Sequence, residues 1–199
     1  MSTPLVIEAG HSEAKGTLNA ALDAPRANET NGAMTKVTAT AMVNGKRVTK
    51  DVNNFGKIKL AEAPKLFVYL EAYAGTAAQS SGATNSAPPL LGTKALELAI
   101  EPGQTIPALL RVQRNGHEEL VTFFVENLPH GVIVDNIGLN GVLIPKGENE
   151  RQIFLTAARW VPETDRWCYA VENQAGRQTS VPVMLHVRKA ALKNSANIK

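Results

Sequence analysis

The sequence has one cysteine, few aromatic residues and no long apolar run. Cys168 has no second cysteine to pair with, so an intrachain disulfide is excluded and a packed core must hold the fold. Only 5% of the residues are aromatic, which leaves little material for a stacking platform. No apolar stretch approaches the ~20 residues of a membrane-spanning helix, and residues 1–20 lack the basic and apolar regions of a signal peptide. We therefore predict no membrane insertion.

Charge of neither sign dominates the chain. It carries 21 Lys and Arg residues against 18 Asp and Glu residues, which gives a formal net charge of +3. Proteins that bind nucleic acids usually gather Lys and Arg into one stripe or face. Here these residues are dispersed, apart from Lys189, Lys193 and Lys199 near the C-terminal end. We predict no nucleic-acid partner, and a basic, solubilising tail over residues 190–199.

The common catalytic and nucleotide-binding motifs are also missing. The sequence contains no G-x-S-x-G, no P-loop and no G-x-G-x-x-G that opens a helix. The acidic residues Glu118, Glu119, Glu148 and Glu150 stand at the edges of predicted loops, whereas a glycosidase needs two carboxylates facing each other ~5–10 Å apart in a cleft. Cys168 is expected to be a small apolar residue of a strand. We predict no enzymatic activity, no catalytic residue and no cofactor.

Two sets of residues deserve consideration as metal ligands. The four histidines are His11, His117, His130 and His186. None stands beside a cysteine or another histidine at a zinc spacing, so we expect them in surface loops or on an outer strand face. Asp135, Asn136 and Asn140 carry the oxygen ligands that suit calcium, but they lack the ligand run of an EF-hand. Because the same residue types form turns by binding their own backbone, we predict a turn and no metal site.

Strand signals run through most of the chain. Aliphatic residues recur at every second position over residues 106–113, 153–158 and 181–188, which places each of these sets on one face of a sheet. Residues 35–49 predict a hairpin folded about Asn44-Gly45, a dipeptide suited to the positive φ angles of a type I′ turn. No segment has a sustained helical period with caps. Residues 15–24 align with the strand-like residues 152–161, so we predict a strand there too.

An internal repeat indicates tandem modules. Residues 5–25 align without a gap with residues 142–162, and both copies share Gly, Glu, Leu, Ala-Ala and Pro at matching positions. The later copy has a long lead-in over residues 94–139, which the earlier copy lacks. We therefore expect the second half of one domain followed by one whole domain, at the end of a longer array.

The predicted fold class is all-β, an immunoglobulin-like antiparallel sandwich preceded by a partial second unit. Residues 73–93 have the Ala, Gly, Ser, Thr and Pro content of a linker. We predict a partial unit over residues 1–72, this linker, and a complete sandwich over residues 94–189. Half a sandwich leaves unpaired edges. Residues 1–72 are therefore expected to pack on the full domain, pair between chains in a self-association, or stay poorly ordered.

One short motif sharpens the prediction of an immunoglobulin-like fold. Residues 165–171 have the spacing of a tyrosine corner, with Val171 where an antibody domain carries its second cysteine. This spacing predicts that Trp167, Tyr169 and Val171 face the core and that Cys168 faces away from it. The Tyr169 hydroxyl is then expected to bond to the backbone across the corner.

Three longer stretches support a resemblance to a known class of module. They are ENLPHGVIVDNIGLNGVLIPKG, FLTAARWVPETDR and VPVMLHVRK. These stretches resemble the C-terminal immunoglobulin-like modules of large secreted proteins from planctomycete bacteria, which often carry pre-peptidase C-terminal-type domains. The resemblance covers residues 96–189 and, more loosely, residues 35–70. It implies an extracytoplasmic location (secreted, periplasmic or at the cell surface) and no particular activity.

These observations favour a non-enzymatic structural or adhesive module, with a protein or a cell-surface polymer as its partner. The alternative is a carbohydrate-binding module accessory to an extracellular hydrolase. In a regular strand Phe154 and Trp160 would share the outer face. Trp160 precedes Val161-Pro162, however, and is expected to pack at the strand end. We expect Trp167 in the core. A cluster of exposed aromatic rings beside amide side chains would favour the alternative. The sequence identifies no ligand-binding residue.

Overall fold

The computed structural model describes residues 5–19, 28–57, 64–73, 96–135, 137–138, 141–173 and 176–189. The chain divides into two compact units, one made of residues 1–20 and 64–199 and the other of residues 21–63. The predicted linker from residue 74 onward and the predicted tail 190–199 lie outside the described residues.

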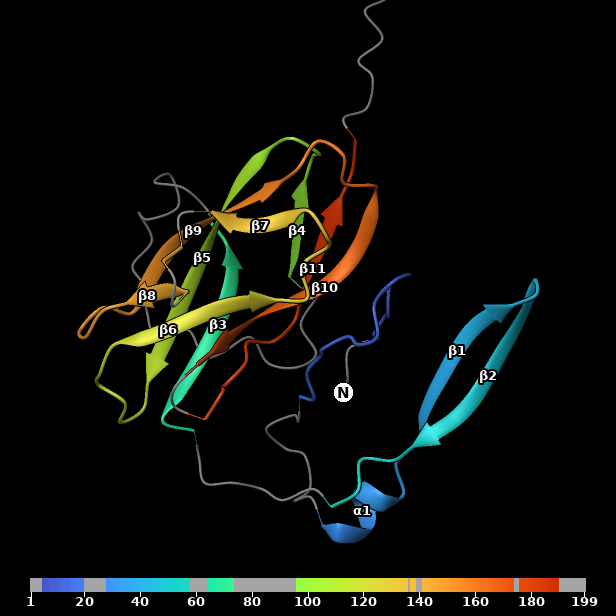
Figure 1. Cartoon of the computed structure of the whole chain (residues 1–199). Coiled ribbons are helices and arrows are strands. Elements are labelled where there is room, and N and C mark those ends of the chain that lie inside the picture. The colour runs from blue at the N-terminus through green and yellow to red at the C-terminus, as the bar shows by residue number, and fades with distance from the viewer. Residues whose placement is uncertain are drawn as a thin grey trace, which may run out of the picture. The chain divides into compact units, whose positions relative to one another are not determined.

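The first unit is a sandwich of two sheets (Figure 1). The five-stranded sheet has the order β4 (Glu97–Ile100), β11 (Val183–Val187), β10 (Thr164–Glu172), β6 (Val121–Glu126) and β8 (Val142–Ile144). The four-stranded sheet has the order β3 (Leu66–Ala72), β5 (Thr105–Arg114), β9 (Glu150–Ala157) and β7 (Val132–Asp135). Neighbouring strands are antiparallel, except that β4 runs parallel to β11. This arrangement confirms the prediction of an all-β, immunoglobulin-like sandwich.

The core lies between the two sheets and follows the period of two in the sequence. On β5 the buried residues are Ala108, Leu110 and Val112, and on β9 they are Ile153, Leu155 and Ala157. Val183, Leu185 and Val187 complete the pattern on β11. The alternation that was predicted for these three segments is therefore confirmed. A fully buried aliphatic side chain contributes ~1.5–3 kcal/mol, so these three strands supply much of the stability.

Strand β10 has the opposite phase to the one predicted. Cys168 and Ala170 belong to the core cluster, so Tyr169 and Val171 point to the other face of the sheet. The Tyr169 hydroxyl donates to Oε2 of Glu126 at 3.0 Å, which is a side chain and not a backbone carbonyl. The tyrosine-corner prediction is therefore wrong. Tyr169 and Val171 are each only 3% exposed, so both faces of β10 are covered. A buried aromatic residue in this strand therefore does not show which face belongs to the core.

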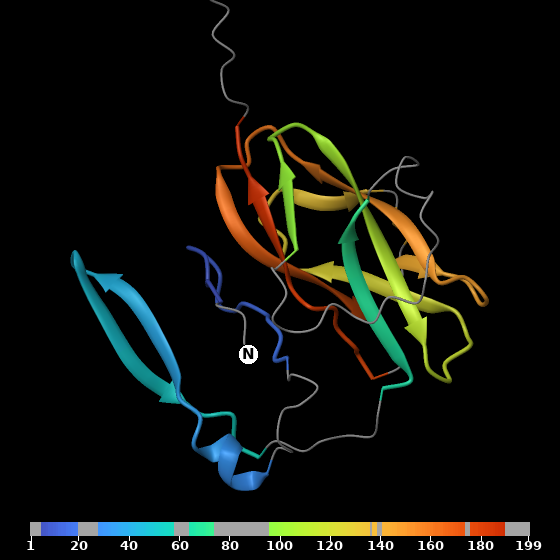
Figure 2. The ribbon, with the colours of Figure 1, turned by 180° about the vertical axis from the view of Figure 1, so that it is seen from behind.

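The sandwich begins earlier in the chain than predicted. Strand β3 pairs with β5 along its whole length, from Leu66 opposite Arg114 to Ala72 opposite Ala108. Figure 2 shows β3 lying beside β5. Its residues Leu66, Val68 and Leu70 are buried in the core. The prediction of a complete domain over residues 94–189 is therefore wrong. The composition of residues 73–93 indicates a linker, but it does not show that the strand before the linker pairs with β5.

Residues 5–19 belong to the sandwich unit but form no regular strand. The segment shows only an isolated bridge residue, Leu18, where a strand was predicted from residue 15 onward. It is held by an ion pair between Glu8 and Arg166 and by a second one between Lys15 and Glu126 at 3.5 Å. The aligned residues 142–156 instead contain β8 and most of β9. The two repeat copies therefore differ in structure over the described residues.

The second unit is a short helix followed by a hairpin. Helix α1 (Glu29–Ala33) precedes β1 (Val37–Val43) and β2 (Lys46–Asn53). Asn44 and Gly45 have φ angles of 50° and 74°, which confirms the predicted hairpin and its turn. In the described part of the chain no third strand joins this sheet. The predicted partial sandwich over residues 1–72 is therefore corrected, because its residues divide between the two units.

Candidate functional site

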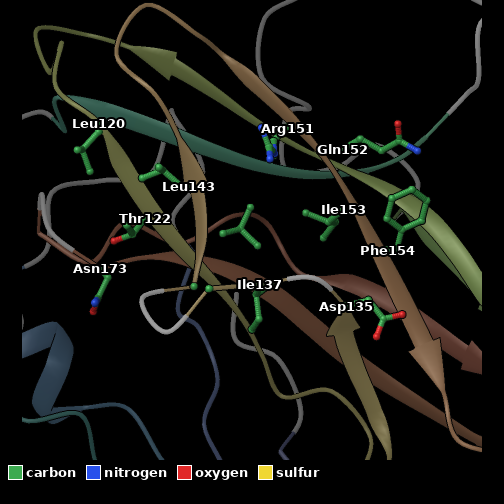
Figure 3. Close-up of a pocket in the computed structure, with 13 residues that line it drawn as sticks. Leu120, Thr122, Asp135, Ile137, Leu143, Arg151, Gln152, Ile153, Phe154 and Asn173 are labelled. Carbon is green, nitrogen blue, oxygen red and sulfur yellow. The ribbon is translucent and has the colours of Figure 1, made fainter.

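A cavity of about 820 Å³ opens at one edge of the sandwich, where β7 ends. Strand β7 pairs with β9 only from Ala157 back to Phe154, although β9 begins at Glu150. Over its first four residues β9 therefore has a strand partner on one side only, among the residues that the structure describes. Figure 3 shows the cavity between this part of β9 and the strands β6 and β8. We call it the edge cavity.

Exposed apolar side chains gather around the edge cavity. Leu120, Ile137, Leu143 and Phe154 all line it, and each is 39–44% exposed. They come from four different places in the fold: the loop before β6, the loop after β7, β8 and β9. Large apolar side chains that gather in a concave part of the surface are typical of a binding site, because covering them removes apolar area from water.

Polar side chains without partners lie beside this apolar surface. Arg151, Gln152 and Asn173 line the cavity, and none of their side chains has a hydrogen-bond or ion-pair partner within the described ranges. Asp135 differs, because its carboxylate accepts a hydrogen bond from the Thr156 hydroxyl. The cavity thus offers one guanidinium group, two amides and one oriented carboxylate. These groups can bind the polar parts of a ligand whose apolar parts contact Phe154 and its neighbours.

The loop between β7 and β8 carries the residues that were considered as calcium ligands. Asp135 is the last residue of β7, and Asn136 and Asn140 lie outside the described residues. The Gly141 N–H donates to the Gly138 carbonyl at 3.1 Å, which closes a turn. Gly141 has a φ of 89°, and a Cβ there would lie 2.2 Å from the Phe123 carbonyl oxygen. Among the described residues, no three His, Cys, Asp or Glu side chains are placed to hold a metal ion.

A second surface is centred on Trp160, which is 61% exposed. Its ring centroid lies 5.2 Å from that of His130, and the His130 ring lies 6.4 Å from the ring of His11. A Cβ on Gly131 would lie 2.5 Å from the Trp160 ring, so the indole rests directly on the backbone of Gly131. Trp160 therefore packs at the strand end, as predicted, yet most of its surface remains open to a partner. We call Trp160, His130 and His11 the tryptophan surface.

The other two histidines lie elsewhere. His186 lies on the outer face of β11, as predicted, with Nδ1 2.6 Å from Oδ1 of Asp165. This hydrogen bond and the neighbouring Arg188 guanidinium hold the pKa of Asp165 below its usual value. His117 lies in the loop before β6, where its carbonyl accepts a hydrogen bond from Arg114 at 2.9 Å. His186 and His117 thus stabilise strands and a loop rather than lining the edge cavity.

The acidic loop residues have structural contacts. Glu119 forms an ion pair of 3.0 Å with Lys146, and its carbonyl accepts a hydrogen bond from Arg114 at 2.7 Å. The Glu148 carbonyl also accepts from Arg114. Arg114 thereby joins the loops that carry both acidic pairs. These contacts agree with the expectation that the acidic residues stand at loop edges.

Two groups in the sandwich have strongly raised pKa values. Burial raises the pKa of the Cys168 thiol to about 12. Burial also raises the pKa of Tyr169, and the adjacent Glu126 carboxylate raises it further. Glu126 in turn lies 3.5 Å from Nζ of Lys15 and 3.7 Å from Nη2 of Arg177. Glu126 joins β6, β10 and the N-terminal segment, a role that only the tertiary fold creates.

Comparisons with known proteins assign no family to this chain. No family model matches this chain, and no curated protein matches it. Among solved structures it is similar to an ASH / PapD-like domain, the PapD-like domain 7 of human CEP192, with 9% sequence identity and a TM-score of 0.32. The match covers 66% of this chain and 89% of that one. Our fold assignment rests on the strand order, not on this similarity.

In the part of the chain that the structure describes, no helix is long and apolar enough to cross a bilayer.

Proposed function

We propose that this chain is a non-enzymatic structural or adhesive module of a secreted or cell-surface bacterial protein, and that it docks a protein or a cell-surface polymer. The observation that carries the proposal is the edge cavity. There, three polar side chains that have no partner among the described residues lie beside four exposed apolar residues. Such a combination suits the binding of an amphipathic polymer. Its polar parts can bond to the polar side chains, and its apolar parts can cover the exposed apolar side chains.

The two strongly shifted groups do not have the protonation that a nucleophile or a general base needs. Cys168 and Tyr169 have raised pKa values, so both stay protonated near neutral pH. A nucleophile or a general base needs the opposite change, a pKa near or below the working pH. The extracytoplasmic location in this proposal comes from the resemblance of residues 96–189 to modules of secreted planctomycete proteins.

A binding panel with matched variants tests the proposal. The full chain is immobilised, and its binding to peptidoglycan, alginate, dextran and a reduced, carboxymethylated protein is measured by interferometry. Leu143→Ala combined with Phe154→Ala should weaken binding to the preferred polymer by about tenfold or more, because two apolar contacts are lost. Ile133→Ala is the control, since Ile133 is exposed on β7 outside the cavity. Absence of binding to every polymer, or equal binding by both variants, would overturn the proposal.

The alternative, a carbohydrate-binding module accessory to a hydrolase, is favoured by one observation. Trp160 is held open to solvent against His130 and Gly131. A fixed aromatic ring can stack on the apolar face of a sugar with little loss of conformational freedom. In the same panel this function predicts that a polysaccharide binds best and that Trp160→Ala abolishes its binding. Unchanged polysaccharide binding by Trp160→Ala would exclude the tryptophan surface as its site.

A further inference from the structure

We propose that the edge cavity takes an extended polypeptide segment, which adds to the open side of β9 as a new strand. The inference rests on the proposed docking function and names the partner chemistry at the same site. In this mode the partner lies beside β9 in the position that β7 leaves open beyond Asp135, and it pairs with Glu150 and Gln152. Main-chain hydrogen bonds then provide affinity, and alternate side chains provide specificity.

The hydrogen-bond pattern of β9 shows which backbone groups face the open side. The Val112 N–H donates to the Asn149 carbonyl at 2.7 Å, so these two residues form a hydrogen-bonded pair. Hydrogen-bonded pairs alternate along an antiparallel ladder. In the register of β5 and β9 the next such pairs join Arg151 with Leu110 and Ile153 with Ala108. Arg151 and Ile153 therefore direct their backbone groups toward β5.

The remaining residues of β9 direct their backbone groups the other way. The Ala158 N–H donates to the Gly131 carbonyl at 2.8 Å, which sets the pattern on the β7 side. By alternation Phe154 bonds to Asp135, the last residue of β7. Gln152 and Glu150 continue this pattern with no strand opposite them in the described ranges. With respect to the described residues, their N–H and C=O groups form an unpaired edge, which is a template for another strand.

The side chains around this edge suit a polypeptide with alternating character. A strand beside β9 would turn one set of side chains toward the inner face of the other sheet, where the core residue Val142 lines the cavity. Its other set would lie on the outer face beside Phe154 and the unpartnered Gln152. Successive side chains of a strand point to opposite faces. We therefore expect a partner sequence in which apolar residues occupy every second position.

The chemistry of the cavity favours a polypeptide over a saccharide. Three of its four exposed apolar residues are aliphatic (Leu120, Ile137 and Leu143), whereas sugar rings stack on flat aromatic faces. A saccharide would also leave the backbone ladder of β9 unused. The Arg151 guanidinium has no partner in the described structure, so an acidic side chain of the peptide can pair with it.

Two substitutions at one position separate backbone recognition from side-chain recognition. Gln152→Pro removes the N–H that faces the open edge, and proline is tolerated on an edge with that orientation. Gln152→Ala keeps the N–H and removes only the amide side chain. The probe is a set of linear peptides selected from a phage-displayed library of 12-residue sequences on the full chain. We expect Gln152→Pro to weaken peptide binding at least tenfold more than Gln152→Ala, with Ile133→Ala unchanged.

Alternate N-methylation of the selected peptide provides an independent test that needs no variant protein. Methyl groups on one alternate set of peptide nitrogens should abolish binding, and methyl groups on the other set should leave it within about threefold, because only one set faces β9. Equal losses for both sets, or equal losses for the two Gln152 variants, would overturn strand addition while the docking function stands. Selection of no peptide, with polysaccharide binding at the edge cavity, would also overturn it. Failure of every polymer and every peptide to bind would overturn both proposals.

Discussion

At the scale of single residues, Gly131 determines how Trp160 is presented. It has a φ of 88°, and the nearest atoms to a Cβ there are those of the Trp160 ring at 2.5 Å. One edge of the indole therefore contacts the backbone of Gly131, and its ring lies beside the His130 ring at an interplanar angle of 49°. An exposed tryptophan with a fixed ring loses little entropy on binding, which is typical of interface hot spots.

A pair of glycine substitutions tests this arrangement. Gly131→Ala and Gly147→Ala both place an alanine at a positive φ, 88° and 82°, and each should lose ~1–2 kcal/mol of unfolding free energy for that reason. Only Gly131→Ala also meets a neighbour, because a Cβ at Gly147 has nothing within 4 Å. We expect a larger loss of stability and a shifted tryptophan fluorescence spectrum for Gly131→Ala alone. Identical behaviour of the two variants would contradict the contact.

The buried thiol of Cys168 gives a second test at this scale. Its pKa of about 12, against an ordinary value of 9.0, lowers the thiolate fraction at pH 8 by about 1000-fold. Native protein should therefore react with a thiol reagent such as Ellman's reagent only after urea unfolds it. The protonated thiol stabilises the fold fully below pH 9, and this contribution is lost as the pH rises toward about 12. Rapid labelling of native protein would place Cys168 outside the core.

At the scale of elements, Asp165 and His186 form a cross-strand pair between β10 and β11. The pKa of Asp165 is lowered, so its contribution to stability is present above its unfolded value of about 3.9 and is lost as the pH falls below it. Urea unfolding of Asp165→Asn from pH 2 to 7 should show a deficit against the unsubstituted chain that disappears at acid pH. Glu101→Gln, in the exposed turn before β5, is the control. A deficit that persists at pH 2 would contradict this role of the Asp165 carboxylate.

The same scale shows why some elements were predictable. Strands β5, β9 and β11 bury one face, so their sequences alternate and were predicted with the correct phase. The Asn44-Gly45 hairpin was predictable because its turn depends on local backbone geometry. Strand β10 is covered on both faces, so its sequence does not show which residues face the core, and the prediction for it was wrong. Residues 15–19 form no regular strand because sequence similarity to β9 does not supply a strand to pair with.

At the scale of the whole molecule, β3 links a distant part of the chain to the sandwich. Glu71 on β3 accepts two hydrogen bonds from Arg111 on β5, and the Arg111 guanidinium lies 4.6 Å from the centroid of the Tyr69 ring. Leu66, Val68 and Leu70 add three buried aliphatic side chains. Their burial contributes about 5 kcal/mol or more, which is comparable with the whole stability of a typical domain.

Two truncated chains test the contribution of β3. A chain of residues 64–199 keeps β3 and should unfold in one cooperative transition. A chain of residues 94–199, which begins at the predicted boundary, should be unfolded or aggregated, because it loses the edge strand and exposes the backbone edge of β5. Circular dichroism and thermal melting distinguish the two outcomes. Equal stability of both chains would show that β3 is not part of the domain.

The edge cavity was less predictable than the fold. The sequence offered Phe154 as an outer-face aromatic residue and Asp135 as a polar loop residue, and both line the cavity. Arg151, Gln152 and Asn173 belong to no motif. Arg151 and Gln152 are open to the cavity because β7 stops opposite Phe154 and does not reach the start of β9. The alternation that places Gln152 and Phe154 on one face was the one local signal. Where a neighbouring strand ends is a tertiary property, and it is not encoded in the residues of β9.

The central claim is that the edge cavity is where this module binds its partner. The most direct test is a nitrogen-15 NMR titration of the full chain with the polymer that binds best in the panel. We predict that the largest shift changes fall on the amides of Arg151, Gln152, Leu143 and Asn173, which surround the cavity. Changes confined to the neighbours of Trp160, or spread evenly over the sandwich, would contradict the account.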